Sequence, residues 1–192
     1  ILHLDLNIGK YDAPDSLDKI LNEALLGWEA LYGSREGEST LALRFKGVVD
    51  RACKLTGQRV VILVDEYDKP LLQAIGNEAL QREFRNMLKP FYGVLKTLDG
   101  CIKFALLTGV TKFGKISVFS DLNNLNDISM YEPFVSICGM TEREIHENLK
   151  AELHELAAAQ KMTYEQAAAE LKECYDGYHF VENTEGIYNP FS

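Results

Sequence analysis

The sequence predicts an α/β protein in which a parallel sheet is flanked by helices and followed by a small helical subdomain. Three apolar runs typical of buried strands, residues 1–6, 59–66 and 101–109, are separated by stretches with helical periodicity. Strands that alternate with helices in this way form βαβ units and a parallel sheet. We expect residues 1–135 to hold the α/β core and residues 136–192 to hold the helical subdomain and the start of a further element.

The second run is the clearest strand signal, because five consecutive apolar residues, Val60–Val64, suit a strand covered on both faces. Two helices are expected before it. Apolar residues at helical spacing occupy 17–31, behind a candidate cap at Ser16, and Gly33 ends that run. A second apolar stripe at 45–53 is closed by Gly57.

A third helix is expected from about Asn77 to Gly100, with a kink or a break at Pro90. After residue 140 the pattern changes to helices alone. The spacings at 141–144 and 163–166 are those of capping boxes, and an apolar-periodic segment follows each. These signals predict the helical subdomain.

Composition bounds the function. The chain has 192 residues with 20 basic and 29 acidic side chains, a formal charge of −9. This balance argues against a surface built to bind nucleic acid. No apolar run approaches the roughly 18 residues of a membrane span, and no signal peptide pattern opens the chain. We therefore expect a cytoplasmic protein without a membrane partner.

The four cysteines lie far apart in sequence and form no C-x-x-C pair. They are Cys53, Cys101, Cys138 and Cys174. Their neighbours are largely apolar or helical, which favours buried free thiols in a reducing compartment.

Two adjacent acids, Asp65 and Glu66, follow the central apolar run. The carboxyl end of a buried parallel strand opens onto the crevice where α/β proteins bind ligands. Successive side chains point to opposite sides, so the two carboxylates suit different tasks. Asp65 would hold Mg²⁺, and Glu66 would position and deprotonate an attacking water. The alternative is that two acids simply end a strand and meet solvent.

A hydroxyl, Thr108, stands at the carboxyl end of the third run, where it could orient water or a terminal phosphate. Its alternative is a structural residue at a strand end. Together with Asp65 and Glu66, this arrangement resembles the additional-strand class of P-loop NTPases, which has Walker B on one strand and a polar sensor on the next.

Other polar residues have weaker signals. The segment 112–133 is too long and polar for a simple connector, which favours a functional role. Within it, Lys112 and Lys115 could meet phosphate or nucleic acid, although solvated loop charge is the simpler interpretation. His146 and His154 are two turns apart on an expected helix, too far for one metal, and are interpreted as surface residues.

Six short motifs, in order, resemble those of the predicted AAA-ATPase-like family of bacteria. They are Val64–Pro70, Leu107–Phe113, Phe119–Ile128, Cys138–Glu142, Tyr175–Tyr178 and Tyr188–Ser192. The resemblance implies that Asp65 and Glu66 are the Walker B pair, that Thr108 is the sensor, and that ATP and Mg²⁺ are the cofactors. It also implies that the Asp65 strand lies between the other two.

The resemblance further implies that the chain is a fragment. The sequence has no G-x-x-x-x-G-K-S/T, and the family places its phosphate loop before the strand that begins at Ile1. The chain also opens without a methionine and stops at Asn189–Ser192, where another element could begin. We expect the fragment alone to be inactive.

Many family members carry a PD-(D/E)xK nuclease-like domain downstream, so nucleic acid is a possible partner of the full-length protein. No particular protein partner is indicated. Two functions stay open: part of an ATP-binding and ATP-hydrolysing domain that supplies Walker B and sensor residues, or a non-hydrolysing regulatory or protein-interaction module on the same fold. A metal-dependent nuclease in this chain is disfavoured, because Tyr67 replaces the acid that should precede Lys69 by two positions.

Overall fold

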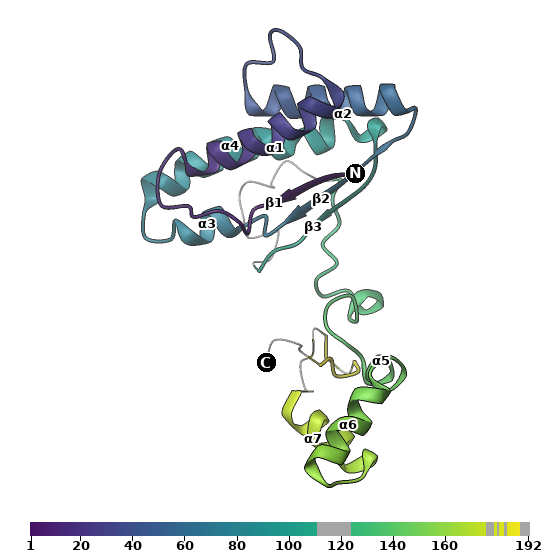
Figure 1. Cartoon of the computed structure of the whole chain (residues 1–192). Coiled ribbons are helices and arrows are strands. Elements are labelled where there is room, and N and C mark those ends of the chain that lie inside the picture. The colour runs from purple at the N-terminus through teal and green to yellow at the C-terminus, as the bar shows by residue number, and fades with distance from the viewer. Residues whose placement is uncertain (111–123, 176–178, 180, 183, 189–192) are drawn as a thin grey trace. The chain divides into compact units, whose positions relative to one another are not determined.

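A computed structural model shows a mixed α/β protein, which confirms the predicted class (Figure 1). The chain divides into two compact units, Ile1–Asn126 and Asp127–Ser192. The structure describes residues 1–110, 124–175, 179, 181, 182 and 184–188.

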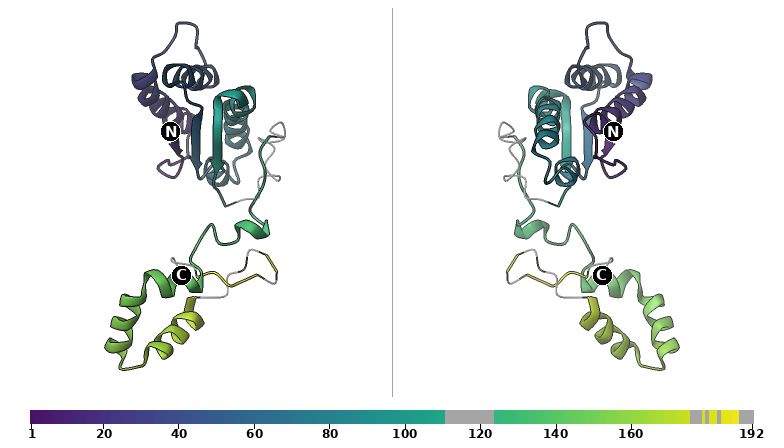
Figure 2. Two further views of the ribbon diagram at one scale, coloured as in Figure 1. Left: turned by 90° about the vertical axis from the view of Figure 1, so that its right-hand side faces the viewer. Right: turned by 90° about the vertical axis from the view of Figure 1, so that its left-hand side faces the viewer.

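The first unit contains a parallel sheet of three strands in the order β1-β2-β3. The strands are β1 (Leu2–Asp5), β2 (Val60–Asp65) and β3 (Ile102–Leu107). Both pairings are parallel, which confirms the expected neighbours and the central place of the Asp65 strand. Figure 2 shows the same unit from two further directions. Since all three strands run the same way, their carboxyl ends meet at one edge.

The strands of this unit are connected by helices on one side of the sheet. β1 leads to β2 through α1 (Ser16–Tyr32) and α2 (Leu41–Thr56), and β2 leads to β3 through α3 (Lys69–Gln73), α4 (Glu78–Thr97) and the 3-10 turn η1 (Asp99–Cys101). Figure 1 shows α1, α2 and α4 above the strands. Right-handed crossovers that step twice in one direction place their helices on the same face.

The core therefore fills one face of the sheet. Leu4, Ile62 and Val64 are buried there against the helices, and the Phe45 ring of α2 stacks on Phe91 of α4 at a centroid distance of 4.5 Å. On the opposite face the described residues leave Phe104 52% exposed. Val61 and Leu63 of β2, which face this side, are half-buried. The predicted full cover of β2 on both faces is therefore confirmed on the helical face only, because both crossovers deliver their helices to the same side.

Two details of the helices differ from expectation, one at the start of α1 and one inside α4. Ser16 is the first residue of α1, not its cap, and its hydroxyl donates to the Ala13 carbonyl at 2.6 Å. α4 runs through Pro90 without a break. Pro90 is exposed, and the buried residues on the opposite side of α4 keep this helix packed on the core. α4 begins directly after Asn77, close to the expected start, and the Asn77 side chain caps it by accepting from the Leu80 amide.

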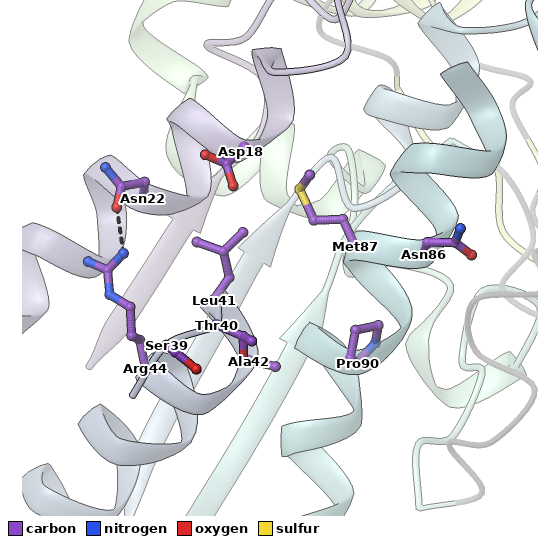
Figure 3. A pocket seen from close by; sticks show the side chains of 10 residues that line it. All are labelled: Asp18, Asn22, Ser39, Thr40, Leu41, Ala42, Arg44, Asn86, Met87 and Pro90. Carbon is purple, nitrogen blue, oxygen red and sulfur yellow. Dashed lines mark hydrogen bonds between the residues drawn. The ribbon is translucent and has the colours of Figure 1, made fainter. Parts of the chain in front are cut away.

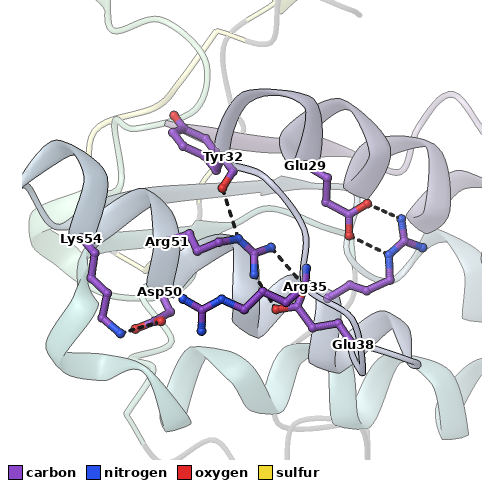
Figure 4. Close-up of polar contacts among 8 residues, drawn as sticks. Glu29, Tyr32, Arg35, Glu38, Asp50, Arg51 and Lys54 are labelled. Atoms are coloured by element: carbon purple, nitrogen blue, oxygen red, sulfur yellow. Dashed lines mark hydrogen bonds and ion pairs between the residues drawn. The ribbon is translucent and has the colours of Figure 1, made fainter.

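Charged side chains fasten the connection between α1 and α2 (Figure 4). Arg51 is only 8% exposed and donates to the Tyr32 carbonyl and to both carboxylate oxygens of Glu38. Arg44 forms a bidentate pair with Glu29 at 2.8 and 2.7 Å. Two-pronged pairs of this kind fix geometry as well as charge.

The second unit is helical. Its elements are the 3-10 turn η4 (Glu132–Phe134), α5 (Glu142–Asn148), α6 (Lys150–Gln160) and α7 (Tyr164–Tyr175). Reciprocal hydrogen bonds between Thr141 and Glu144 and between Thr163 and Gln166 confirm both predicted capping boxes. A small core of Ile145, Leu153 and Tyr188 holds the helices together.

The expected single helix carrying both histidines is two helices, because α5 ends at Asn148 and α6 begins at Lys150, with Leu149 between them. His146 and His154 both pack on Tyr164, with ring centroids 5.6 and 4.7 Å away. The His146 Nδ1 also lies 2.7 Å from the Tyr164 hydroxyl. The three rings therefore form an aromatic cluster within the second unit.

The prediction of buried thiols is wrong. Cys138 and Cys174 are exposed, and Cys53 and Cys101 are half-buried. The prediction failed because neighbours in sequence point in different directions on a helix, so apolar neighbours do not imply that the cysteine itself is buried. Among the helices that the structure describes, none is both long and apolar enough to cross a bilayer.

Candidate functional site

The three strand ends form a continuous edge in the first unit. In register, Asp5 of β1 lies opposite Asp65 of β2. Backbone hydrogen bonds continue the ladder beyond the strands: the Leu6 amide donates to the Asp65 carbonyl at 3.1 Å, and the Thr108 amide donates to the Val64 carbonyl at 2.9 Å. The side chains at this edge are therefore held by paired backbone.

The structure brings Asp65 and Thr108 together. The Thr108 hydroxyl donates to the Asp65 carboxylate. Both residues are exposed, so the pair faces solvent at the carboxyl edge of the sheet. The position of the pair agrees with what the strand pattern predicted.

Glu66 follows directly and has an unusual backbone. Its φ is 56°, in the left-handed region that residues other than glycine rarely adopt. The Glu66 carbonyl accepts from the Lys69 amide at 3.0 Å, which turns the chain into α3. Strained backbone of this kind persists where the surroundings impose it and clusters at functional sites.

Two further acids near this edge were not predicted as site residues. Asp5 ends its strand as Asp65 ends its own, and its carboxylate accepts from the Asn7 amide at 2.7 Å. Asp68 is fully buried and accepts from the Val110 amide at 3.3 Å. The signal for Asp5 was an acid after an apolar strand. Nothing in the sequence distinguishes the buried Asp68 from an exposed turn residue.

The short helix α3 connects the loops around the edge. The Lys69 ammonium donates to the Asn7 carbonyl at 3.0 Å and also to the Asn7 side chain. The Gln73 side-chain oxygen accepts from the Tyr11 amide at 2.9 Å. The loop after β1 is thus fastened to the element that follows β2.

Tyr11 adds a buried tie to the same loop. Its hydroxyl donates to the Leu6 carbonyl at 2.7 Å. Burial, and secondarily the charge of Asp5, raise the pKa of Tyr11 above its ordinary value. The hydroxyl therefore stays protonated and remains a donor over the whole physiological range.

The donor set at the edge fits Mg²⁺ bound together with phosphates. Mg²⁺ prefers oxygen ligands and is commonly held by one or two carboxylates, waters and substrate phosphates. Asp65 offers an exposed carboxylate beside the Thr108 hydroxyl. Among the described residues there is no group of three His, Cys, Asp or Glu side chains placed to hold a metal without such help.

A groove of about 540 Å³ lies elsewhere in this unit, on the helical layer (Figure 3). Asp65, Glu66 and Thr108 do not line it. Its lining residues are Asp18, Asn22, Ser39, Thr40, Leu41, Ala42, Arg44, Asn86, Met87 and Pro90. Its cation, Arg44, is engaged by Glu29 and Asn22. We therefore assign the candidate site to the strand edge. Lys112 and Lys115 lie outside the described residues.

Comparison with known proteins gives two matches. The profile of a family described as "Predicted AAA-ATPase" matches residues 1–119. A protein of Azotobacter chroococcum mcd 1, described as an uncharacterized protein in the 5′ region of vnfD, is 37% identical over 185 residues. That alignment covers 94% of this chain, and the chain spans about a third of that relative's length. No solved structure matches the chain.

Proposed function

Because the chain belongs to the predicted AAA-ATPase-like family, we propose that it supplies the magnesium-holding and water-activating part of an ATP-hydrolysing site. The observation that carries the proposal is the hydrogen bond from Thr108 to Asp65 at the carboxyl edge of two adjacent parallel strands. Ligands of open α/β sheets bind outside this edge.

Each residue has a distinct task in this proposal. Asp65 holds Mg²⁺ through a carboxylate that the Thr108 hydroxyl orients. Bound Mg²⁺ neutralises charge on the phosphates during transfer. Thr108 also offers its oxygen to the attacking water or to the terminal phosphate. Glu66 takes the proton of that water as general base.

The strained backbone of Glu66 supports its role. A φ of 56° costs about 1–2 kcal/mol for a residue with a Cβ, and glycine would avoid this cost. The general-base role would explain why a glutamate, and not a glycine, occupies this position. In this proposal the complete catalytic site also needs a phosphate-binding loop from outside these residues, because the 192 residues contain no G-x-x-x-x-G-K-S/T motif.

The test is ATP turnover by the full-length protein. Glu66→Gln keeps the shape of the side chain but cannot accept the proton, so we expect ATP binding to persist and turnover to fall by at least about 100-fold. Glu36→Gln, in the exposed loop after α1, is the matched control and should leave both quantities unchanged.

Phosphate release and nucleotide binding are measured in parallel. Undiminished turnover by Glu66→Gln would remove the general base from the proposal. ATP binding without turnover by the wild-type protein would instead favour the non-hydrolysing regulatory module.

A further inference from the structure

Asp68 is a buried carboxylate at the edge of the candidate site to which the proposed chemistry gives no task. It is fully buried, although an ionised carboxylate is costly to remove from water unless hydrogen bonds compensate it. It occupies the position before α3 where an aspartate ordinarily caps the helix. Its side chain makes no capping hydrogen bond there.

The carboxylate is directed instead to a distant part of the chain. Its Oδ1 accepts from the Val110 amide, 42 positions away and two residues beyond Thr108. The bond therefore crosses from the turn after β2 to the chain after β3. Between them, the Tyr67 amide donates to the Thr108 carbonyl at 2.9 Å. These contacts hold the backbone that follows the Thr108 side chain, and the Thr108 amide, which precedes it, donates to the Val64 carbonyl at 2.9 Å.

The intervening glycine shows how closely the two segments approach. A Cβ at Gly109 would lie 2.6 Å from the Asp68 Oδ1 and 2.7 Å from the Tyr67 ring. Real Cβ atoms do not approach other atoms so closely, so any side chain at 109 would push the segment away. The close approach of the two segments thus requires a glycine at position 109.

We propose that Asp68 is a positioning residue of the site, whose buried carboxylate holds the chain after β3 so that the Thr108 hydroxyl meets Asp65. The catalytic consequence of this inference rests on the proposed ATPase function. Asp68 itself touches neither nucleotide nor water in this proposal. It acts through Thr108.

The test uses the full-length protein and two substitutions of Asp68. Asp68→Ala removes the acceptor, and the misplaced Thr108 should lower kcat by about 100-fold with the KM for ATP close to that of the wild type. Asp68→Asn keeps an oxygen that can accept from Val110 and should recover most of kcat. Gly109→Ala should resemble Asp68→Ala. Asp15→Asn, an exposed acid at the start of α1, is the control.

A double-mutant cycle separates positioning from a general loss of structure. If Asp68 acts through Thr108, the double variant Asp68→Ala with Thr108→Val should be no slower than Thr108→Val alone. Losses that multiply in the double variant, or equal loss in Asp68→Asn and Asp68→Ala, would overturn the inference.

Amide hydrogen exchange supplies a readout that needs no ATPase activity. The Val110 amide should exchange faster in Asp68→Ala than in the wild type and in Asp68→Asn. If the wild-type protein hydrolyses no ATP, the proposed function fails, and exchange at Val110 still decides whether Asp68 holds this segment. Unchanged exchange in Asp68→Ala would overturn it.

Discussion

The hydroxyl of Thr108 donates to the carboxylate of Asp65 across the ends of two parallel strands, although 43 positions separate these residues in the chain. The contact places a neutral donor next to an exposed acid. It also makes the orientation of Asp65 depend on a side chain from another strand, and that dependence can be measured.

Thr108→Val removes the hydroxyl but keeps the branched shape. We expect turnover of the full-length protein to fall by about 100-fold, the order of loss when one preorganised donor is removed from an active site. Thr108→Ser should restore most of the activity. Thr97→Val is the control, because the Thr97 hydroxyl bonds only within its own helix, to the Gly93 carbonyl, in the contacts seen. Activity of Thr108→Val equal to wild type would remove the sensor role.

Glu66→Gly should stabilise the protein while abolishing turnover. Glycine avoids the strain of about 1–2 kcal/mol at a φ of 56° but loses about 0.5–1 kcal/mol more in conformational entropy on folding, so the expected net gain in the free energy of unfolding is about 0.5–1 kcal/mol. The measurement is urea denaturation together with phosphate release.

Lys161→Gly is the matched control for this strain. Lys161 also has a φ of 56°, at the end of α6 in the other unit. It should stabilise that unit by a similar amount and leave turnover unchanged. A stability loss in Glu66→Gly would show that contacts of the glutamate outweigh the strain.

The pair of Glu29 and Arg44 should make stability depend on pH. The hydrogen bond from Arg44, with the charge of the guanidinium, holds the pKa of Glu29 below its ordinary value of 4.5. The stabilisation is therefore complete above that value and is lost as the pH falls through the lower pKa of the folded state. The free energy of unfolding of Glu29→Gln, measured by urea denaturation between pH 5 and the acid limit of folding, should therefore lack this pH dependence. An unchanged pH profile would contradict the assignment.

Residues 1–192 alone should show no ATP turnover above background in Mg²⁺ buffer. The sequence lacks the loop whose amides and lysine cradle the β and γ phosphates, so binding itself should be lost. Phosphate release and nucleotide binding check this expectation. Turnover by these residues alone would mean that another group grips the phosphates.

The strand edge was predictable because a few strong rules determine it. Apolar runs gave the three strands, and parallel order alone brings their carboxyl ends together, so Asp65 and Thr108 could be expected to meet. The capping boxes at Thr141 and Thr163 could likewise be predicted, because they depend only on hydrogen bonds between residues three positions apart.

Other features depend on contacts that sequence patterns do not encode. α3 is one short turn whose position is set by Lys69 and Gln73 reaching a loop more than sixty residues away. The left-handed backbone of Glu66 and the burial of Asp68 are likewise imposed by tertiary packing. Local propensity contains no information on either.

The short helix α3 has a consequence for how the site loses its order. Hydrogen bonds from its turn and side chains reach the loop after β1 and the segment after β3. Five residues form few helical bonds of their own, so α3 should open locally at a lower free energy than the core strands. One opening event would release both neighbouring segments together. The edge would then be either fully ordered or fully open. The free energy of the cooperative transition between these two states should lie well below that of global unfolding.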